Sequence, residues 1–158
     1  MSFMQVSRKV DYALRAVIHL AGDAHRERSC SVAEIAEREC IPRQFLEKIV
    51  RDLFRTGLVK SRRGPHGGYV LARPAEEMTF RHVIEAVEGP ISLNVCVGEH
   101  AECSLMGACG MNRVWAEGQR RVMDLFQNTT IASVRHSKSV LTGHVIPEYP
   151  TPEKVQRT

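Results

Sequence analysis

The sequence predicts a mainly α-helical fold with one small β-hairpin and a long C-terminal helix. Three observations support this prediction. Apolar residues recur at helical spacing through most of the chain, a stretch rich in glycine and arginine near residues 58–74 has the pattern of a hairpin, and a second long amphipathic pattern starts after Gly110. At 158 residues, the chain has enough material for one compact domain and an extension.

The first two helices are expected to begin at serines. Ser7 is placed to cap a first helix, and Ser31 with Glu34 has the spacing of a capping box, in which each side chain bonds the other's backbone N–H. Cys40-Ile-Pro42 then forms a three-residue turn. The apolar positions of the first helix are Val10, Ala13, Leu14, Val17, Ile18 and Ala21.

A third helix is predicted between Pro42, which suits a first helical turn, and Gly57, which suits a C-terminal cap. One stripe of this helix is apolar and the opposite side is polar and mostly basic. A short helix, a tight turn and a longer helix with a basic outer face are typical of a helix-turn-helix, although two core helices of a bundle would give the same pattern. The apolar stripe is Phe45, Leu46, Ile49, Val50, Leu53 and Phe54, and the other side carries Arg43, Gln44, Glu47, Lys48, Arg51 and Arg55.

The hairpin after this helix makes the prediction a winged helix-turn-helix domain over residues 1–90. Arg62 and Arg63 lie at the shoulder of the hairpin, where an extended loop is able to place a guanidinium in a DNA minor groove. A fourth helix is expected from Thr79 to the Gly89-Pro90 stop. Residues 91–110 follow this domain and show no helical or strand periodicity, so they are expected to form a separate loop.

The charge distribution favours double-stranded DNA as a partner. The chain has a net charge of +4, and its segment 43–73 holds eight lysines or arginines and two acids. A basic element of this kind is the electrostatic footprint of a protein that binds a polyanion. A solvated basic face is the alternative that charge alone leaves open.

The loop 91–110 contains Cys96, Cys103 and Cys109, separated by six and then five residues, with no lysine or arginine between Arg81 and Arg113. Thiolates are soft donors that suit an iron–sulfur cluster or zinc, and three of them leave a fourth ligand to come from elsewhere. One alternative is a zinc ion with His100 as its fourth ligand. The other is that the three cysteines are free and have only a structural role. Cys30 and Cys40 are expected to be packing residues.

Residues 111–136 are predicted to be a dimerisation helix and a following turn, and residues 137–158 a disordered tail. The helix has an apolar stripe that a single small domain has too little surface to cover, so we expect a homodimer with Trp115, Val122 and Leu125 in its interface. Packing of this stripe on its own domain is the alternative.

The N-terminus lacks the pattern of a signal peptide, and no apolar run approaches membrane-spanning length, so a cytoplasmic protein without membrane contact is expected. Five cysteines, an odd number, favour reduced or metal-bound thiols over a disulfide framework. The sequence shows no acid/base pair or substrate-binding glycine loop, so an enzyme is not predicted. An iron–sulfur electron carrier with a basic docking face is the remaining competing class.

Several motifs together resemble the iron–sulfur winged-helix regulators typified by IscR, NsrR and RirA. They are Asp11-Tyr-Ala-Leu-Arg15, the helix-turn-helix pattern from Ser31 to Gly57, the wing sequence Arg63-Gly-Pro-His-Gly-Gly-Tyr-Val-Leu, and the triple-cysteine loop followed by Trp115. The similarity extends from about Met4 to Val134. It implies a bacterial homodimeric transcriptional regulator that binds operator DNA and responds to iron, nitric oxide or redox state through a bound cluster.

The resemblance also implies roles for individual residues. Gln44, Glu47 and Lys48 match positions that meet base edges, with Arg43 and Arg51 on the same major-groove face, and Arg63 matches the minor-groove arginine of the wing. The three loop cysteines match the cluster ligands, a four-iron cluster being favoured over a two-iron one. Asn112 stands where the IscR type has a histidine ligand, whereas Asp11 matches the aspartate ligand of the NsrR type. A regulator of the same fold that senses a metabolite or thiol oxidation without a cluster is the alternative.

Overall fold

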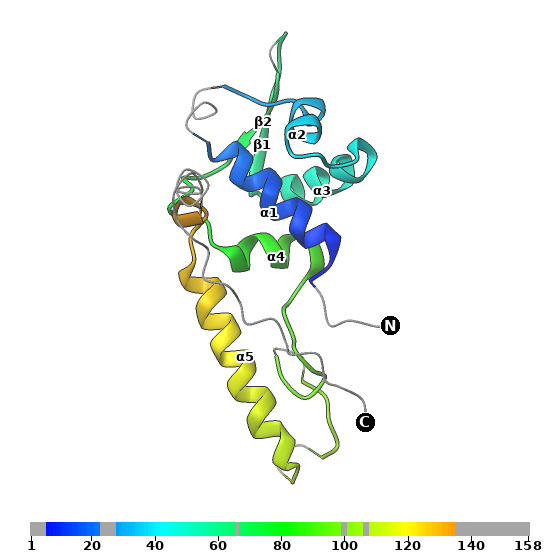
Figure 1. Ribbon diagram of the computed structural model, residues 1–158, viewed down its shortest axis with the longest axis vertical. Helices are drawn as coiled ribbons and strands as arrows, with labels where there is room; N and C mark the ends of the chain where they lie inside the picture. The colour runs from blue at the N-terminus through cyan, green and yellow to red at the C-terminus, as the bar shows by residue number, and fades with distance from the viewer. Residues whose placement is uncertain (1–5, 23–27, 66, 99–100, 106–107, 135–158) are drawn as a thin grey trace, which may run out of the picture.

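Figure 1 shows the computed structural model of the chain, which describes residues 6–22, 28–65, 67–98, 101–105 and 108–134. The predicted tail, residues 137–158, and His100 lie outside the described residues. The mainly helical fold with one hairpin is confirmed. Its elements are α1 (Arg8–Leu20), α2 (Val32–Arg38), α3 (Arg43–Arg55), β1 (Val59–Arg62), β2 (Gly68–Leu71), α4 (Phe80–Glu88) and α5 (Gly110–Asn128).

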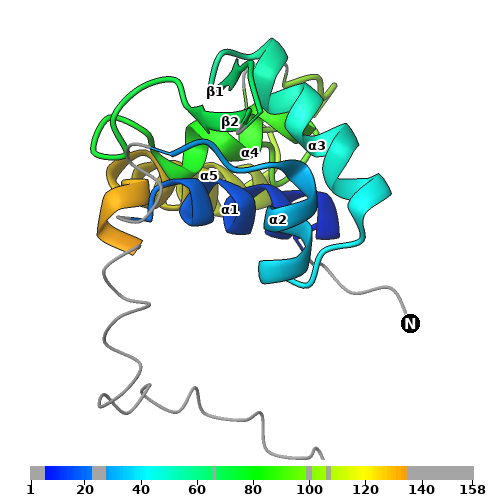
Figure 2. The same cartoon turned by 90° about the horizontal axis from the view of Figure 1, so that it is seen from above.

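The hydrophobic core lies where α1, α3 and α4 pack against one another. Each of these helices contributes an apolar stripe whose central side chains are fully removed from water, which is the main stabilising term for a domain of this size. Figure 2 shows α2 and α3 side by side on one flank, with α1 and the hairpin next to them. Core side chains with no more than 2% exposure include Val17, Ile35, Leu46, Ile49, Val50, Leu53, Met78 and Val83.

The predicted apolar stripe of α3 is buried only at its centre. Leu46, Ile49, Val50 and Leu53 face the core, whereas the side chains of Phe45 and Phe54 are 49% and 52% exposed. These two positions lie at opposite edges of the stripe, because residues 45 and 54 fall on either side of its midline at 100° per residue. Phe45 packs its ring edge against Tyr12 of α1, with 6.1 Å between the ring centroids.

The helix ends follow the sequence signals with one difference. Ser7 and Ser31 cap α1 and α2, their hydroxyls accepting from the backbone N–H groups of Val10 and Glu34. The second half of the predicted capping box at Ser31 is replaced, because the Glu34 carboxylate pairs with Arg28. A complete capping box forms instead at α4, where Thr79 and His82 bond each other's backbone N–H groups.

The strands β1 and β2 pair antiparallel, with Val59 opposite Leu71 and Arg62 opposite Gly68. On its other edge, β2 pairs with Cys30: each of Cys30 and Tyr69 donates its backbone N–H to the other's carbonyl, at 3.0 and 2.8 Å. A Cβ atom at Gly68 would lie 2.4 Å from the carbonyl oxygen of Cys30, so this close approach requires glycine. The wing is therefore fixed to the segment that enters α2.

The helix α5 extends away from the winged-helix core, on the side opposite to the hairpin (Figure 1). None of its residues is buried within the chain. After α5 the chain returns to the core, where Ile131 is fully buried and donates its N–H to the carbonyl of Met78 at 2.7 Å. The segment made of the cysteine loop and α5 is thus connected to the winged-helix core at both of its ends. Across the described ranges, no helix has the length and apolar character needed to span a bilayer.

Candidate DNA-binding face and cysteine pocket

The predicted base-contacting residues form one exposed face of α3. Arg43, Gln44, Glu47, Lys48 and Arg51 all point to solvent. Arg43 donates from Nε to the Glu47 carboxylate at 3.0 Å, and Arg51 donates from Nε to the Glu47 carbonyl at 3.3 Å. This face therefore presents cationic donors, an amide and a carboxylate side by side, which are the groups that recognise base edges in a major groove.

At Asp52, next to this exposed face, α3 is joined to the rest of the core by a lysine. The ammonium of Lys9 on α1 lies 2.8 Å from the Asp52 carboxylate on α3 and also donates to the carbonyl of Val87 on α4. The hydrogen bond from Lys9, opposed by partial burial, lowers the pKa of Asp52 below its ordinary value. This contact joins α1, α3 and α4 and so helps to hold the exposed face of α3 in place.

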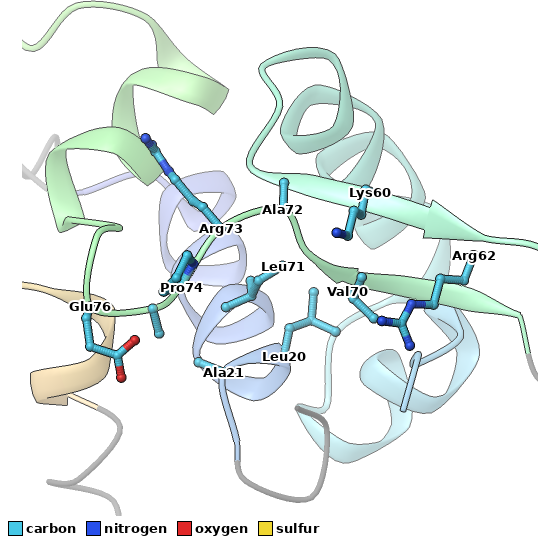
Figure 3. Close-up of a pocket in the computed structure, with 11 residues that line it drawn as sticks. Leu20, Ala21, Lys60, Arg62, Val70, Leu71, Ala72, Arg73, Pro74 and Glu76 are labelled. Carbon is cyan, nitrogen blue, oxygen red and sulfur yellow. The ribbon is translucent and has the colours of Figure 1, made fainter. Parts of the chain in front are cut away.

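The two predicted wing residues, Arg62 and Arg63, are both exposed but occupy different places. Arg62 ends β1, and its guanidinium lies beside Val70 (Figure 3), where it lines a hollow of about 420 Å³ at the base of the wing with Lys60 and Leu20. Arg63 follows the strand, at the start of the turn. Of the two, Arg63 is therefore nearer to the tip that would enter a groove.

The structure brings the three predicted ligand cysteines around one small pocket at the N-terminal end of α5. The pocket measures about 150 Å³, and Cys109 is itself the N-cap residue of α5. The side-chain amide of Asn112 donates to the carbonyl of Cys96 at 3.2 Å, which holds the loop against the helix. The lining residues are Asn94, Val95, Cys96, Cys103, Leu105, Cys109, Met111, Asn112 and Trp115.

The three thiols share a pocket without converging on one point. Cys96, Cys103 and Cys109 are partly buried and free of disulfides. Within the part of the chain that the structure describes, no three His, Cys, Asp or Glu side chains come together closely enough to hold a single metal ion. Cys30 is buried in the core, and Cys40 is exposed in the turn between α2 and α3, so neither belongs to this pocket.

The remaining predicted site residues are more scattered. Asp11 is exposed on α1, where its carboxylate lies 3.6 Å from the Arg15 guanidinium, and it does not line the cysteine pocket. Trp115 lines that pocket, Val122 is partly buried against its own chain, and Leu125 is 62% exposed. Met111 and Val114 add two further exposed apolar side chains to α5.

Three residues that position these sites were missed by the sequence analysis. Gln119 bonds the backbone of the loop at Ile91 and Leu93, and Asn112 bonds the backbone at Cys96. Arg28 lines a hollow beside the wing. The sequence singles out Asn112 only because it replaces a histidine ligand, and gives no sign of its bond to the loop. Gln119 and Arg28 stand among other polar residues, so nothing in the local sequence marks them. Gln119 acts on a residue 26 positions away, and Arg28 acts through the hairpin packed beside it.

Comparison with known proteins supplies the decisive observation for identity. The model of the Rrf2 family, described as an iron-dependent transcriptional regulator, matches residues 6–137. The chain belongs to the Rrf2 family. This confirms the resemblance stated from the sequence and the winged-helix fold, and it makes the protein a DNA-binding transcriptional regulator and not an enzyme.

Individual Rrf2-type relatives agree with this assignment. The chain is 34% identical over 119 residues to an Rrf2-like helix-turn-helix regulator of Rhodobacter capsulatus, covering 71% of this chain and 79% of the relative. It is 31% identical over 138 residues to the transcriptional regulator IscR of Erwinia tasmaniensis, covering 87% and 82%. Its structure resembles that of CymR, the global cysteine regulator of B. subtilis, with a TM-score of 0.71, 28% identity and coverage of 85% and 98%.

Proposed function

We propose that this Rrf2-family regulator controls its binding to operator DNA through an iron–sulfur cluster held by Cys96, Cys103 and Cys109. The observation that carries the proposal is that the three thiols, spread over fourteen positions of sequence, line one pocket. Val95, Leu105 and Met111 also line it, so donors of the soft kind lie in a largely apolar setting. When bound, such a cluster supplies chemistry that is sensitive to oxygen, nitric oxide and iron supply.

The arrangement of the cysteines favours a cluster over a single zinc ion. Structural zinc requires its ligands to meet about 2.3 Å from one point. In a four-iron cluster, each thiolate instead binds a different iron, so the ligands surround a volume and do not meet at one point. Among the described residues, the three thiols line one pocket but do not meet at one point, which argues against a single zinc ion and is why we favour a cluster. The N-terminus of α5 at Cys109 adds a favourable field for the negative charge of a thiolate-ligated cluster.

The fourth ligand in this proposal is Asp11, contributed by the second copy of a homodimer. Asn112 lies beside the cysteines, but its amide nitrogen is engaged by the carbonyl of Cys96, and an amide is a weak donor to iron. Asp11 is exposed on α1, where its carboxylate lies beside Arg15 of the same helix, so the carboxylate is accessible to another chain. The exposed apolar residues of α5 supply a face for the dimer.

The proposed DNA contacts come from the exposed face of α3 and from the wing. The exposed face of α3 enters the major groove through Gln44, Glu47 and Lys48, flanked by Arg43 and Arg51, and Arg63 of the wing enters the adjacent minor groove. Two copies then meet two half-sites, so the operator has approximate twofold symmetry. Control by the cysteine loop acts through its connections at α4 and α5.

A second candidate is a regulator of the same fold that senses thiol oxidation or a metabolite without a cluster. Its support is the likeness to a structure described as a cysteine regulator and the exposed thiol of Cys40 at the helix-turn-helix turn. The two candidates differ in one direct property. The first requires iron and sulfide in stoichiometric amounts, and the second requires none.

The deciding experiment is anaerobic purification followed by visible spectroscopy, iron and sulfide analysis, and selection of bound duplexes from a random pool. The proposal expects visible absorption from a cluster and an operator affinity that changes when the cluster is removed. Cys103→Ala should lose the cluster, while Cys40→Ala, which lies outside the pocket, should keep it. A Cys103→Ala protein with full iron and sulfide content would overturn the ligand set. Equal binding of every duplex in both states would overturn the regulatory mechanism.

A further inference from the structure

A hollow of about 880 Å³ lies between the start of α2 and the wing. We call it the α2–wing hollow. It belongs neither to the exposed face of α3 nor to the cysteine pocket. Its residues are Arg28, Ser29, Ser31, Glu34, Arg62, Arg63, Gly64, Pro65 and Gly67.

The backbone fixes the two walls of the hollow relative to each other. The pair of hydrogen bonds between Cys30 and Tyr69 joins the segment before α2 to β2. Gly68 permits this approach, because any side chain there would collide with the Cys30 carbonyl. Arg28 lies two positions before Cys30, so the side of the hollow that carries Arg28 is held against the wing. The hollow is therefore preorganised.

The hollow is strongly basic. It is lined by three arginines from two separate segments and by one carboxylate, Glu34. That carboxylate accepts a hydrogen bond from Nη2 of Arg28, an arginine whose side chain is 58% exposed. The remaining lining residues are small or uncharged, which leaves room for a group with several oxygens. Arginine guanidinium groups are well matched to phosphate, which they bind through paired N–H donors.

The position of the hollow relative to DNA indicates which phosphate it would meet. In a helix-turn-helix, the recognition helix occupies the major groove and the preceding helix crosses the sugar–phosphate backbone. The proposed docking places α3 in the major groove and Arg63 in the neighbouring minor groove. One backbone strand separates these two grooves, so that strand passes between α3 and the wing, across the start of α2.

We propose that the α2–wing hollow is a binding site for a phosphate of the DNA backbone, and that Glu34 competes with this phosphate for Arg28. In the free protein, Glu34 holds Arg28 as an internal substitute for phosphate. On DNA, Arg28 exchanges its carboxylate partner for a phosphate oxygen. This inference rests on the proposed docking of α3 and the wing. It gives Glu34 the role of limiting the affinity of the protein for DNA.

The test is Glu34→Gln, measured by fluorescence anisotropy on a selected operator duplex and on a random duplex across a range of salt concentrations. The substitution preserves the cap of α2, because Ser31 accepts from the backbone N–H of residue 34. An exposed ion pair is worth about 0.2–1 kcal/mol, so its removal should tighten binding by up to about five-fold at low salt. The gain should be equal on both duplexes, because a phosphate carries no sequence information.

Three further variants make this result specific. Glu77→Gln removes the same charge from an exposed residue outside the hollow, and it should change affinity much less. Arg28→Ala should weaken binding and lower the slope of log K against log salt by about 0.9, the value for one phosphate contact. In the Arg28→Ala background, Glu34→Gln should increase DNA affinity little further, because Glu34 then no longer competes with phosphate for Arg28.

An equal effect of Glu34→Gln and Glu77→Gln would overturn the inference, because only general charge would then matter. A full gain from Glu34→Gln in the Arg28→Ala background would overturn the competition for Arg28. Both outcomes would leave the cluster proposal intact, since the random-duplex measurements need neither a cluster nor an operator. Conversely, loss of cluster control with an unchanged Glu34 effect would count against the proposed function alone.

Discussion

The side-chain amide of Gln119 on α5 bonds the loop on both sides of one residue: its oxygen accepts from the backbone N–H of Leu93 at 2.9 Å, and its nitrogen donates to the carbonyl of Ile91 at 2.7 Å. The amide thus pairs with the loop as a neighbouring β-strand would. Since Ile91 lies three residues after the end of α4, this contact connects the DNA-binding core to the middle of α5.

We therefore predict that Gln119→Ala loosens the loop without unfolding the core. The substitution leaves a partly buried N–H and carbonyl without their partner, at a cost of about 1–3 kcal/mol. Hydrogen exchange at Leu93 should accelerate markedly, while exchange in α1 and α3 should be unchanged. Gln127→Ala is the matched control, because Gln127 is exposed on the same helix. Protection at Leu93 that survived Gln119→Ala would show that the clamp is not needed.

The thiol of Cys30 should make stability depend on alkaline pH. Burial, helped by the charge of Glu34 and opposed by Arg28, raises the pKa of Cys30 from 9.0 to about 11. The unfolded chain then loses this proton first as the pH rises, so the free energy of unfolding should fall between about pH 9 and 11. Urea unfolding should show a smaller decline for Cys30→Ala than for the unchanged protein. Equal declines would contradict the assignment.

The local signals predicted the framework of this fold well. Ser7, Ser31 and Thr79 cap helices where the sequence placed them, and Gly57 has a φ of +73°, as expected after a helix end. Such signals depend on residues within a few positions of each other. Glu34 shows the limit, because its predicted partner was three residues away whereas its observed partner, Arg28, comes from the preceding segment.

The sites were less predictable because they depend on contacts between distant segments. The cysteine spacing indicated a ligand cluster, but the Asn112 and Gln119 bonds that hold the loop join residues 16 to 28 positions apart. Trp115 is an example. Its helical spacing predicted a place in the dimer interface, whereas the structure shows that it lines the cysteine pocket. Periodicity identifies an apolar face but not what covers it.

Arg63 should contribute sequence-dependent affinity, unlike Arg28, for which we propose a phosphate contact. We expect Arg63→Ala to weaken operator binding by about 1–3 kcal/mol with a smaller effect on random duplex, because a guanidinium in a minor groove responds to groove shape. Arg28→Ala should weaken both duplexes to a similar extent and should reduce the salt slope by about 0.9, because a phosphate contact carries no sequence information. Anisotropy titrations on both duplexes measure these effects. Equal losses on both for Arg63→Ala would remove its role in specificity.

The exposed stripe of α5 should form the dimer interface. Leu125→Asp is the clearest variant, because Leu125 is 62% exposed and its replacement leaves the fold of one chain undisturbed. Sedimentation should show monomers, and operator affinity should fall because two half-sites are no longer bound together. Val122→Asp should act in the same direction, although Val122 is also partly buried in its own chain. A Leu125→Asp protein that sedimented as a dimer would place the interface elsewhere.

Asp11 provides the sharpest test of the proposed ligand set, since two roles compete for it. Within one chain it pairs with Arg15 at an exposed i,i+4 position, a contact worth only about 0.3–0.5 kcal/mol, so losing it should hardly change stability. If Asp11 instead completes the coordination across the dimer, Asp11→Ala should alter the visible spectrum, speed the loss of iron and change operator binding in the loaded state. Arg15→Gln separates the roles, because it removes the helix contact and keeps the carboxylate. A spectrum, iron content and DNA response unchanged by Asp11→Ala would reduce Asp11 to the partner of Arg15 and return the fourth position to another ligand.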